Sequence, residues 1–366
     1  MVHNNTLRRR WLLMAGLYCS LVATAQQSHL TLVFTGDIMG HDTQIASALA
    51  TGEEGYDYKP CFTYIEPYLN SADVVIGNLE VSLAGPPYKG YPQFSSPDEL
   101  ADALKWAGFD ILVTANNHAL DRGQQGLERT LEQLDNRGIL HTGTFAGPES
   151  RELSYPLVVA KNGIRVALLN YTYGTNGLKV RPPSIVNRID TELIKEDLKK
   201  AARAEPDFTI VTMHWGSEYQ NSENAHQREI ARFLFDHGAD VVIGSHPHVV
   251  QPIWGEEKGN LVAYSMGNLI SNQRDRFRDG GIAFELELAK EGNETRVANH
   301  GYLPLWVWKP QTTKGYMFML VPANLEPAVI DVLGMSIEDR TKMTQFLLDT
   351  RVNLDGHGEV VPIWMN

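Results

Sequence analysis

The chain has 366 residues, of which 43% are hydrophobic and 21% are charged, a balance that is normal for a globular protein with a substantial core. This length allows one large domain or two ordinary ones. The formal net charge of −12 argues against non-specific binding to nucleic acid or to anionic lipid, because both repel an acidic surface.

The N-terminal segment has the features of an export signal. Arg8-Arg9-Arg10 precede the apolar run 11–22, and Ala23-Thr24-Ala25 then forms a small-residue cleavage site. We therefore predict a signal peptide over residues 1–25 and an exported protein that is periplasmic, on the cell surface or secreted. The apolar run is too short to span a bilayer comfortably, and no later run reaches about 18 residues. We expect no stable transmembrane span after cleavage; a retained N-terminal anchor is the alternative.

Cleavage would change the composition of the mature chain. Lys+Arg falls from 32 to 29 against 44 acidic residues, so the net charge becomes −15. Cys61 remains as the only cysteine, so we expect no internal disulfide and a fold held together without one. Lipidation at Cys19 is disfavoured because the bulky Tyr18 precedes it, and Arg9-Arg10 resembles a twin-arginine signal only faintly.

Strand-like runs alternate with amphipathic helical stretches as far as about residue 270, which predicts an α/β protein. We expect helices over residues 124–136, 191–204, 223–237 and 336–350. Two strands, 155–159 and 164–169, are predicted to form a hairpin, because Asn162-Gly163 supports a type I′ turn. Residues 85–92 and 174–183 lack periodicity and are predicted as loops that could shape a substrate cleft.

Beyond residue 280 the pattern changes. Residues 281–288 alternate between apolar and polar or small residues, as in a half-buried antiparallel strand, and Trp306-Val307-Trp308 is expected to continue in β-structure. No linker rich in Gly, Ser or Pro separates the parts. The predicted organisation is the signal peptide 1–25, a core over residues 26–280 and a β-rich C-terminal extension over residues 281–366 that packs on the same domain.

Polar residues of one chemical kind follow several apolar strand-like runs. They are Asp37, Glu80, Asn117 with His118, His214, and His246 with His248. Open α/β sheets bind ligands beyond the carboxyl ends of their strands, so these side chains should converge. Carboxylate, amide and imidazole groups without thiolate suit Mn, Fe or Zn. Each residue alone would fit ordinary turn chemistry, but their repetition favours a metal site.

These motifs, in their order along residues 30–275, resemble the capsule-biosynthesis CapA proteins (poly-γ-glutamate synthesis), a branch of the calcineurin-like metallophosphoesterase superfamily. The motifs are Gly36-Asp37-Ile38-Met39, Gly77-Asn78-Leu79-Glu80, Asn116-Asn117-His118 followed by Asp121, His214-Trp215-Gly216, Gly244-Ser245-His246-Pro247-His248 and Tyr264-Ser265-Met266-Gly267-Asn268. The resemblance implies a four-layer α-β-β-α sandwich and a site for two divalent metal ions, with Mn, Zn or Fe as candidates.

The resemblance also implies roles for individual residues. One metal would be held by Asp37 and His248, the other by Asn117, His214 and His246, and Glu80 would bridge them. His118 would be a general acid, with a supporting hydrogen-bond role as the alternative. Asp121 would orient the His118 ring, or else cap the following helix.

The chain departs from the wider superfamily at one metal ligand. Many relatives open with Asp-x-His, whereas Met39 stands here at the position of the histidine, and thioether sulfur is a poor ligand for these metals. We therefore expect a weaker first metal site. His41 could substitute for the missing ligand, or it could be an ordinary loop histidine.

Substrate contacts are predicted from the segment that follows the last motif. Asn268 is expected to close the site by hydrogen bonding. Arg274, Arg276 and Arg278 could present an anionic substrate, because arginine binds carboxylate or phosphate through two parallel hydrogen bonds. Solvated surface charge is the alternative for these arginines. Trp215 and Tyr219 are candidates either for the cleft wall or for the core.

The predicted function is an exported metal-dependent hydrolase in capsule or exopolymer poly-γ-glutamate metabolism, acting on a phosphoester or a γ-glutamyl amide. The expected partners are an anionic polymer or small-molecule substrate and, in addition, components of a capsule synthase. The alternative is a non-catalytic, metal-containing polymer-binding or assembly factor for capsule synthesis.

Overall fold

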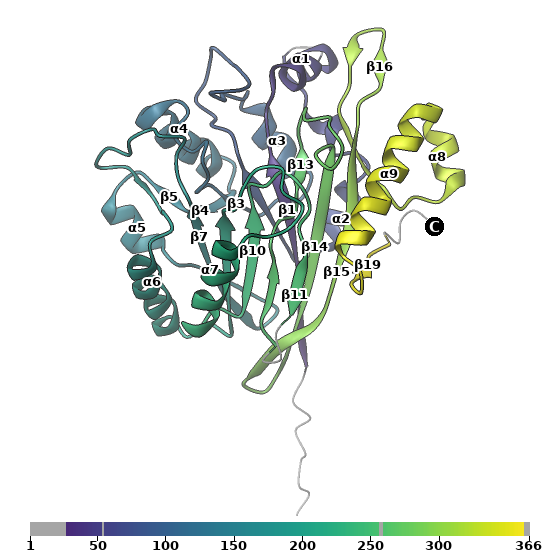
Figure 1. Ribbon diagram of the computed structural model, residues 1–366. Helices are drawn as coiled ribbons and strands as arrows, with labels where there is room; N and C mark the ends of the chain where they lie inside the picture. Colours follow the sequence, from purple (N-terminus) through teal and green to yellow (C-terminus); the bar gives the residue numbers. More distant parts are fainter. Residues whose placement is uncertain (1–26, 53–54, 256–258, 362–366) are drawn as a thin grey trace, which may run out of the picture.

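The computed structural model describes residues 27–52, 55–255 and 259–361 (Figure 1). The predicted signal peptide over residues 1–25 lies outside these ranges. Among the described residues, no helix is both long enough and apolar enough to cross a bilayer.

The larger of two main sheets has nine strands, in the order β18-β15-β14-β1-β2-β3-β4, with β13 paired to β1 and β19 to β15. The strands β1 to β4 run parallel, whereas β14 pairs antiparallel with β1 and with β15. The bounds are β1 Ser28–Ile38, β2 Val74–Leu79, β3 Ile111–Val113, β4 Leu140–Thr142, β13 Asn268–Ile270, β14 Gly280–Glu291, β15 Glu294–Trp308, β18 Met319–Pro322 and β19 Gly358–Glu359.

The second sheet has six strands in the order β11-β12-β10-β9-β7-β6. Its strands are β6 Leu157–Lys161, β7 Ile164–Thr172, β9 Phe208–His214, β10 Val241–Ser245, β11 Ile253–Gly255 and β12 Leu261–Ala263. Two small ribbons complete the strands, one of β5 Thr144–Phe145 with β8 Ile185–Val186 and one of β16 Gln311–Thr312 with β17 Gly315–Tyr316.

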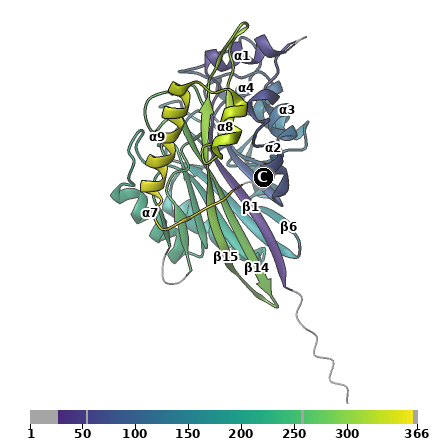
Figure 2. The same ribbon diagram turned by 90° about the vertical axis from the view of Figure 1, so that its right-hand side faces the viewer.

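The two sheets pack face to face because alternate residues of their strands are apolar. Leu32 and Phe34 of β1 lie in one buried cluster with Ile210 of β9 and Ile243 of β10. Val33, on the opposite face of β1, belongs instead to a cluster that includes residues of α2 and α3. The outer face of the second sheet is covered by α6 and α7. Figure 2 shows α7 on one side of the strands and α2 and α3 on the other. The predicted four-layer α-β-β-α sandwich is therefore confirmed.

The helices are α1 Asp42–Thr51, α2 Glu66–Ser71, α3 Glu99–Trp106, α4 Gly123–Asp135, α5 Pro148–Ser154, α6 Thr191–Arg203, α7 Ala225–Asp236, α8 Pro327–Leu333 and α9 Ile337–Asn353, with a short 3-10 turn over Lys59–Cys61. The four helices predicted from the sequence correspond to α4, α6, α7 and α9. Asp190 accepts hydrogen bonds from the first turn of α6, as a helix cap does. The predicted hairpin joins β6 to β7, and Asn162 and Gly163 have the positive φ angles, 53° and 77°, that a type I′ turn requires.

Residues beyond 280 complete the larger sheet. β14 lies directly beside β1, and β15 follows it as a long antiparallel partner. α9 packs its Met343 and Phe346 against Trp306 and Trp308 of β15.

Candidate metal centre

The candidate site lies where the carboxyl ends of strands from both sheets meet. In the larger sheet Asp37 of β1 pairs in register with Asn78 of β2, and in the second sheet Ser245 of β10 pairs with His214 of β9. Parallel strands in register end at the same edge, so the residues that follow them are brought together. The convergence expected from the sequence is therefore what the fold produces.

Asp37 is fully buried and accepts hydrogen bonds on both carboxylate oxygens. Asn78 donates its Nδ2–H to Oδ1 at 2.7 Å, and His248 Nδ1 lies 3.0 Å from Oδ2. Burial alone would raise the pKa of Asp37, but the hydrogen bond and charge of His248, together with the hydrogen bond from Asn78, hold it below its ordinary value. Asp37 is therefore present as a carboxylate.

Glu80 directly follows β2, and its carboxylate is also completely buried. Neither oxygen has a hydrogen-bond partner among the described residues. His214 Nε2 lies 3.6 Å and His248 Nε2 3.8 Å from Glu80 Oε1. Burial, and then the neighbouring charge of Asp37, raises the pKa of Glu80 well above its ordinary value. A buried carboxylate without donors is unfavourable unless a cation compensates it.

His214 is the last residue of β9, and both of its ring nitrogens are engaged. Its Nε2 lies 2.8 Å from Asn117 Oδ1, and Asn78 donates its Nδ2–H to Nδ1 at 3.2 Å. Burial, followed by the charges of His246 and His248, lowers the pKa of His214 well below its ordinary value. The ring is therefore held neutral, which is the protonation state that ligates metals.

His246 and His248 follow β10 with positive φ angles of 99° and 58°, which are uncommon for residues other than glycine. Strain of this kind is concentrated at functional sites. Burial, and then the charge of His248, lowers the pKa of His246 to about 3. The buried Nδ1 of His246 has no hydrogen-bond partner among the described residues. The turn therefore leaves one imidazole nitrogen of His246 buried and unpaired within the described part of the chain.

The donor set fits metal ions. Two groups of ligand atoms lie mutually within 4.8 Å, one made of Glu80, His246 and His248 and the other of Asp37, Glu80 and His214. Both groups contain Glu80, the residue that the family resemblance makes the bridge. His246 lies in the group with His248, and its ring centre is 4.8 Å from that of His214.

His118 and Asp121 form a buried pair beside this cluster. His118 Nδ1 lies 2.8 Å from Asp121 Oδ2, and the same carboxylate oxygen accepts the backbone N–H of Phe94 at 2.7 Å. The ring of Phe94 packs edge-on against His118 with centroids 4.7 Å apart. No side chain caps α4, whose N-cap residue is Arg122. The structure thus places Asp121 against the ring of His118 rather than at the cap.

Asn268 supports the histidine at the other side of the cluster. Its Oδ1 lies 3.0 Å from His248 Nδ1, and its Nδ2 donates to the carbonyl oxygen of Arg278 at 2.8 Å. This side chain therefore orients His248 and fixes the segment that follows β13.

The three candidate substrate arginines have separate surroundings. The Arg278 guanidinium stacks 3.6 Å from the ring centre of Tyr219, whose ring is 6.1 Å from that of His248. Arg276 instead forms an ion pair with Asp349 of α9 at 2.7 Å. Arg274 donates to the carbonyl oxygen of Val307 at 2.7 Å and packs over Trp306. The structure brings Arg278 to the edge of the site, whereas Arg274 contacts β15 and Arg276 contacts α9.

Met39 and His41 both contact residues outside the two ligand groups. Met39 is 2% exposed and belongs to the apolar cluster under α2 and α3. Asn272 donates its backbone N–H to His41 Nδ1 at 3.2 Å. Trp215 is buried and donates its indole N–H to the carbonyl oxygen of Tyr264, so it belongs to the core.

Tyr173 is a site residue that the sequence reasoning missed. It follows β7, and its ring centre lies 4.5 Å from that of His246 and 6.2 Å from that of His214. Its side chain is 42% exposed, so it forms part of the site's rim. Its position directly after an apolar strand is the signal that could have identified it.

A four-layer α/β sandwich with carboxylates, imidazoles and an amide at its strand ends defines a protein of the metallophosphoesterase type with a candidate metal centre. The chain belongs to the bacterial capsule synthesis protein family PGA_cap, whose family model matches residues 31–273. The resemblance seen in the motifs is thereby confirmed.

Two curated relatives agree with this membership. The chain is 32% identical over 284 residues to the PGA biosynthesis protein CapA of Bacillus subtilis, covering 74% of this chain and 71% of that protein. It is 30% identical over 263 residues to the capsule biosynthesis protein CapA of Bacillus anthracis, covering 68% and 61%. A solved calcineurin-like phosphoesterase, YfkN of Bacillus subtilis, aligns with a TM-score of 0.47 and 15% identity, covering 89% of this chain and 99% of that one.

Proposed function

We propose that the protein is an exported, metal-dependent hydrolase of capsule or exopolymer metabolism, acting on a phosphoester or a γ-glutamyl amide. The observation that carries this proposal is Glu80, a fully buried carboxylate without a hydrogen-bond donor that lies within 4 Å of two imidazoles. Such a group is a cation ligand rather than a structural hydrogen-bond acceptor. Membership of a capsule synthesis family supports the biological setting.

Two divalent ions, with Mn, Zn or Fe as candidates, would be held by Asp37, Glu80, Asn117, His214, His246 and His248. When bound, such ions act as Lewis acids on the scissile group and make a water molecule nucleophilic at neutral pH. Asn78 and Asn268 would keep Asp37 and His248 in position, since hydrogen bonds to a metal ligand hold its side chain in one orientation.

His118 would supply the proton that the leaving group needs. Because Asp121 accepts the Nδ1–H of His118, the Nε2 atom is the one left to carry and donate a proton. The Asp121 carboxylate is itself fixed by the backbone N–H of Phe94, so the ring is held in one orientation. This arrangement resembles the histidine–carboxylate pairs that serve general acid catalysis.

Export is supported by the sequence alone, through the basic, apolar and small-residue segments of residues 1–25. A second candidate function, a non-catalytic binding or assembly factor for a capsule synthase, is favoured by the buried position of Met39, which offers no ligand where many superfamily members have a histidine. The two candidates differ in whether the chain turns over a substrate.

The test is hydrolysis and metal content of the mature protein with His118→Ala. We expect at least one metal ion per chain in both forms, because His118 is in neither ligand group. Turnover of substrates with poor leaving groups should fall by about 10²–10⁴-fold, and turnover of a nitrophenyl ester should fall less, because its leaving group needs little protonation.

His226→Ala is the matched control, because this histidine is exposed and its one contact within the described ranges is with Glu229 at 3.8 Å. His226→Ala should change neither the metal content nor the turnover. If the metal-loaded protein hydrolyses neither phosphoesters nor γ-glutamyl amides yet binds polyglutamate, the assembly-factor function replaces the hydrolase.

A further inference from the structure

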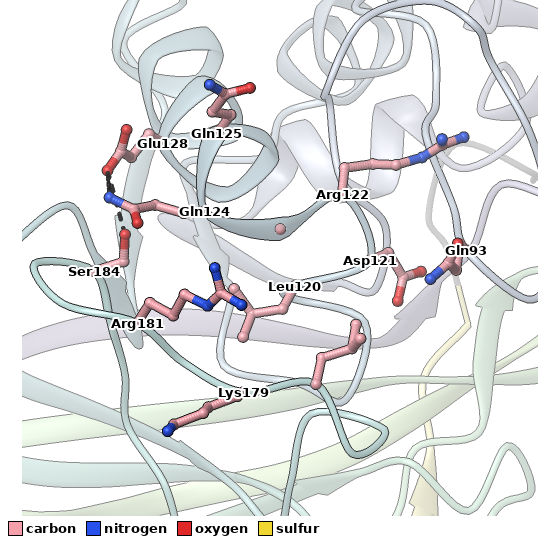
Figure 3. Close-up of a pocket in the computed structure, with 12 residues that line it drawn as sticks. Gln93, Leu120, Asp121, Arg122, Gln124, Gln125, Glu128, Lys179, Arg181 and Ser184 are labelled. Atoms are coloured by element: carbon pink, nitrogen blue, oxygen red, sulfur yellow. Dashed lines mark hydrogen bonds between the residues drawn. The ribbon is translucent and has the colours of Figure 1, made fainter.

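A cavity of about 720 Å³ opens beside the His118–Asp121 pair (Figure 3). Its walls come from the start of α4 and from the loop that joins β7 to β8. The lining residues that matter here are Asp121, Arg122, Gln124, Glu128, Lys179 and Arg181. A cavity of this size can enclose a group as large as several amino-acid residues. It shares Asp121 with the His118–Asp121 pair and therefore borders that pair on the side of His118 Nδ1.

The charge of the cavity is positive on balance. Its lining has three cationic residues, Arg122, Lys179 and Arg181, against the two acidic residues Asp121 and Glu128. Within the described part of the chain, Glu128 accepts hydrogen bonds only from neutral groups, the amide of Gln124 at 2.8 Å and the hydroxyl of Ser184 at 3.3 Å, and keeps its negative charge. Lys179 and Arg181 make no hydrogen bond or ion pair with any residue that the structure describes, and both are exposed. These two cations favour anions in the cavity of a chain whose net charge is −12.

The cationic groups do not converge on one point. Figure 3 shows Arg181 extending toward Leu120, Lys179 pointing away from it, and Arg122 on the far side of Asp121. Arg122 is held in that direction because it donates to the carbonyl oxygen of Pro87 at 3.2 Å. A single phosphate would require donors aimed at one centre. Cations spread along a cavity fit a chain that carries several separated carboxylates.

We propose that this cavity binds a carboxylate-bearing stretch of a polyanionic chain beside the His118–Asp121 pair, with Arg181 and Lys179 as its ionic contacts. This inference deepens the proposed function and rests on it for the reaction that the bound chain would undergo. It replaces Arg274 and Arg276 as anchors of the substrate, since those arginines contact α9, Val307 and Trp306. Neither Lys179 nor Arg181 was singled out from the sequence.

The experiment is equilibrium binding of a fluorescently labelled, short γ-linked oligoglutamate to the metal-loaded mature protein, with recovery of the intact probe verified by mass spectrometry. Arg181→Ala and Lys179→Ala should each weaken binding about tenfold, and the affinity of the unmutated protein should fall as salt is raised. Arg203→Ala is the matched control. It removes the same charge from an exposed site before β9, at the strand end opposite His214.

Two competitors distinguish the source of the anionic groups. Uncharged γ-linked oligoglutamine should not displace the probe, and inorganic phosphate should do so only weakly. Equal affinity of Arg181→Ala, Lys179→Ala and the unmutated protein would overturn the proposal, as would complete displacement by phosphate at comparable concentration. If the protein binds the probe through these residues but hydrolyses no substrate, the cavity assignment holds and the hydrolase function is wrong. If the protein hydrolyses a substrate but both variants bind the probe as the unmutated protein does, the hydrolase function holds and the cavity assignment is wrong.

Discussion

Glu80 shows how one residue can lower the stability of the metal-free protein and still be required for the site. Its buried carboxylate has no donor, so it opposes folding whenever it is charged and no cation is bound. We expect Glu80→Gln to raise the melting temperature of the chelator-treated protein at neutral pH and to abolish the stabilisation that added metal gives. Differential scanning calorimetry with and without Mn measures both effects.

The pH dependence follows from the raised pKa of Glu80. Below its ordinary value of 4.5 the carboxyl is protonated in both the folded and the unfolded state and costs nothing. As the pH rises, the unfolded chain ionises first, and the folded metal-free protein loses stability. The advantage of Glu80→Gln should therefore grow as the pH rises above the ordinary value of 4.5 and level off only above the raised pKa of the folded state. Glu229→Gln, at an exposed position, should show no such trend; an advantage that is constant with pH would contradict the assignment.

The residues of the candidate centre could be predicted because each has a local sequence signal. Asp37, Glu80 and His214 all stand at the end of an apolar strand, and the sheet alone brings them together. The arginines could not be placed in the same way, because the partner of Arg274 is 33 residues away and that of Arg276 is 73 residues away. Nothing near them in the sequence reveals those partners.

At the scale of elements, α9 is held to the larger sheet chiefly by its apolar face. Phe346 is 3% exposed and packs with Trp306 and Met343, whereas Leu348 on the same helix is 51% exposed. Phe346→Ala should cost about 3–5 kcal/mol of unfolding free energy, because it leaves a cavity beside β15. Leu348→Ala should change the unfolding free energy by less than about 0.5 kcal/mol.

Chemical denaturation of both variants measures this difference. Equal losses would mean that α9 is not anchored through Phe346.

The helices and the hairpin of β6 and β7 could be predicted because their periodicity, caps and turn residues are local. The pairing of β1 with β14 could not be predicted, because the two strands are far apart in the sequence. Alternation of apolar and polar residues predicts a strand but does not show which other strand it pairs with.

For the whole molecule, the metal centre joins the two sheets. Asp37 and Glu80 extend from the larger sheet, and His214, His246 and His248 extend from the second. Bound metal should therefore stabilise the folded state by an amount that rises with metal concentration, about 2.7 kcal/mol at a concentration one hundred times the dissociation constant. Chelation should lower the melting temperature, and restored metal should raise it again.

Thermal melts across a metal titration measure this linkage. A comparison variant, His214→Ala, should gain less stability from metal than the unmutated protein, because one of the two ligand groups is disrupted. A melting temperature of the unmutated protein that is independent of metal would show that the cluster does not hold an ion under those conditions.

The position of β1 between β2 and β14 has a consequence for biosynthesis. The first strand ends at Ile38, and its antiparallel neighbour begins only at Gly280. At translation rates of about 5–20 residues per second, the ribosome needs roughly 10–50 s to deliver that neighbour. Throughout this interval one edge of β1 stays open, so the nascent chain cannot complete its larger sheet. Until then the unpaired edge of β1 is a site where another strand can pair wrongly, so the nascent chain is most prone to aggregation during this interval.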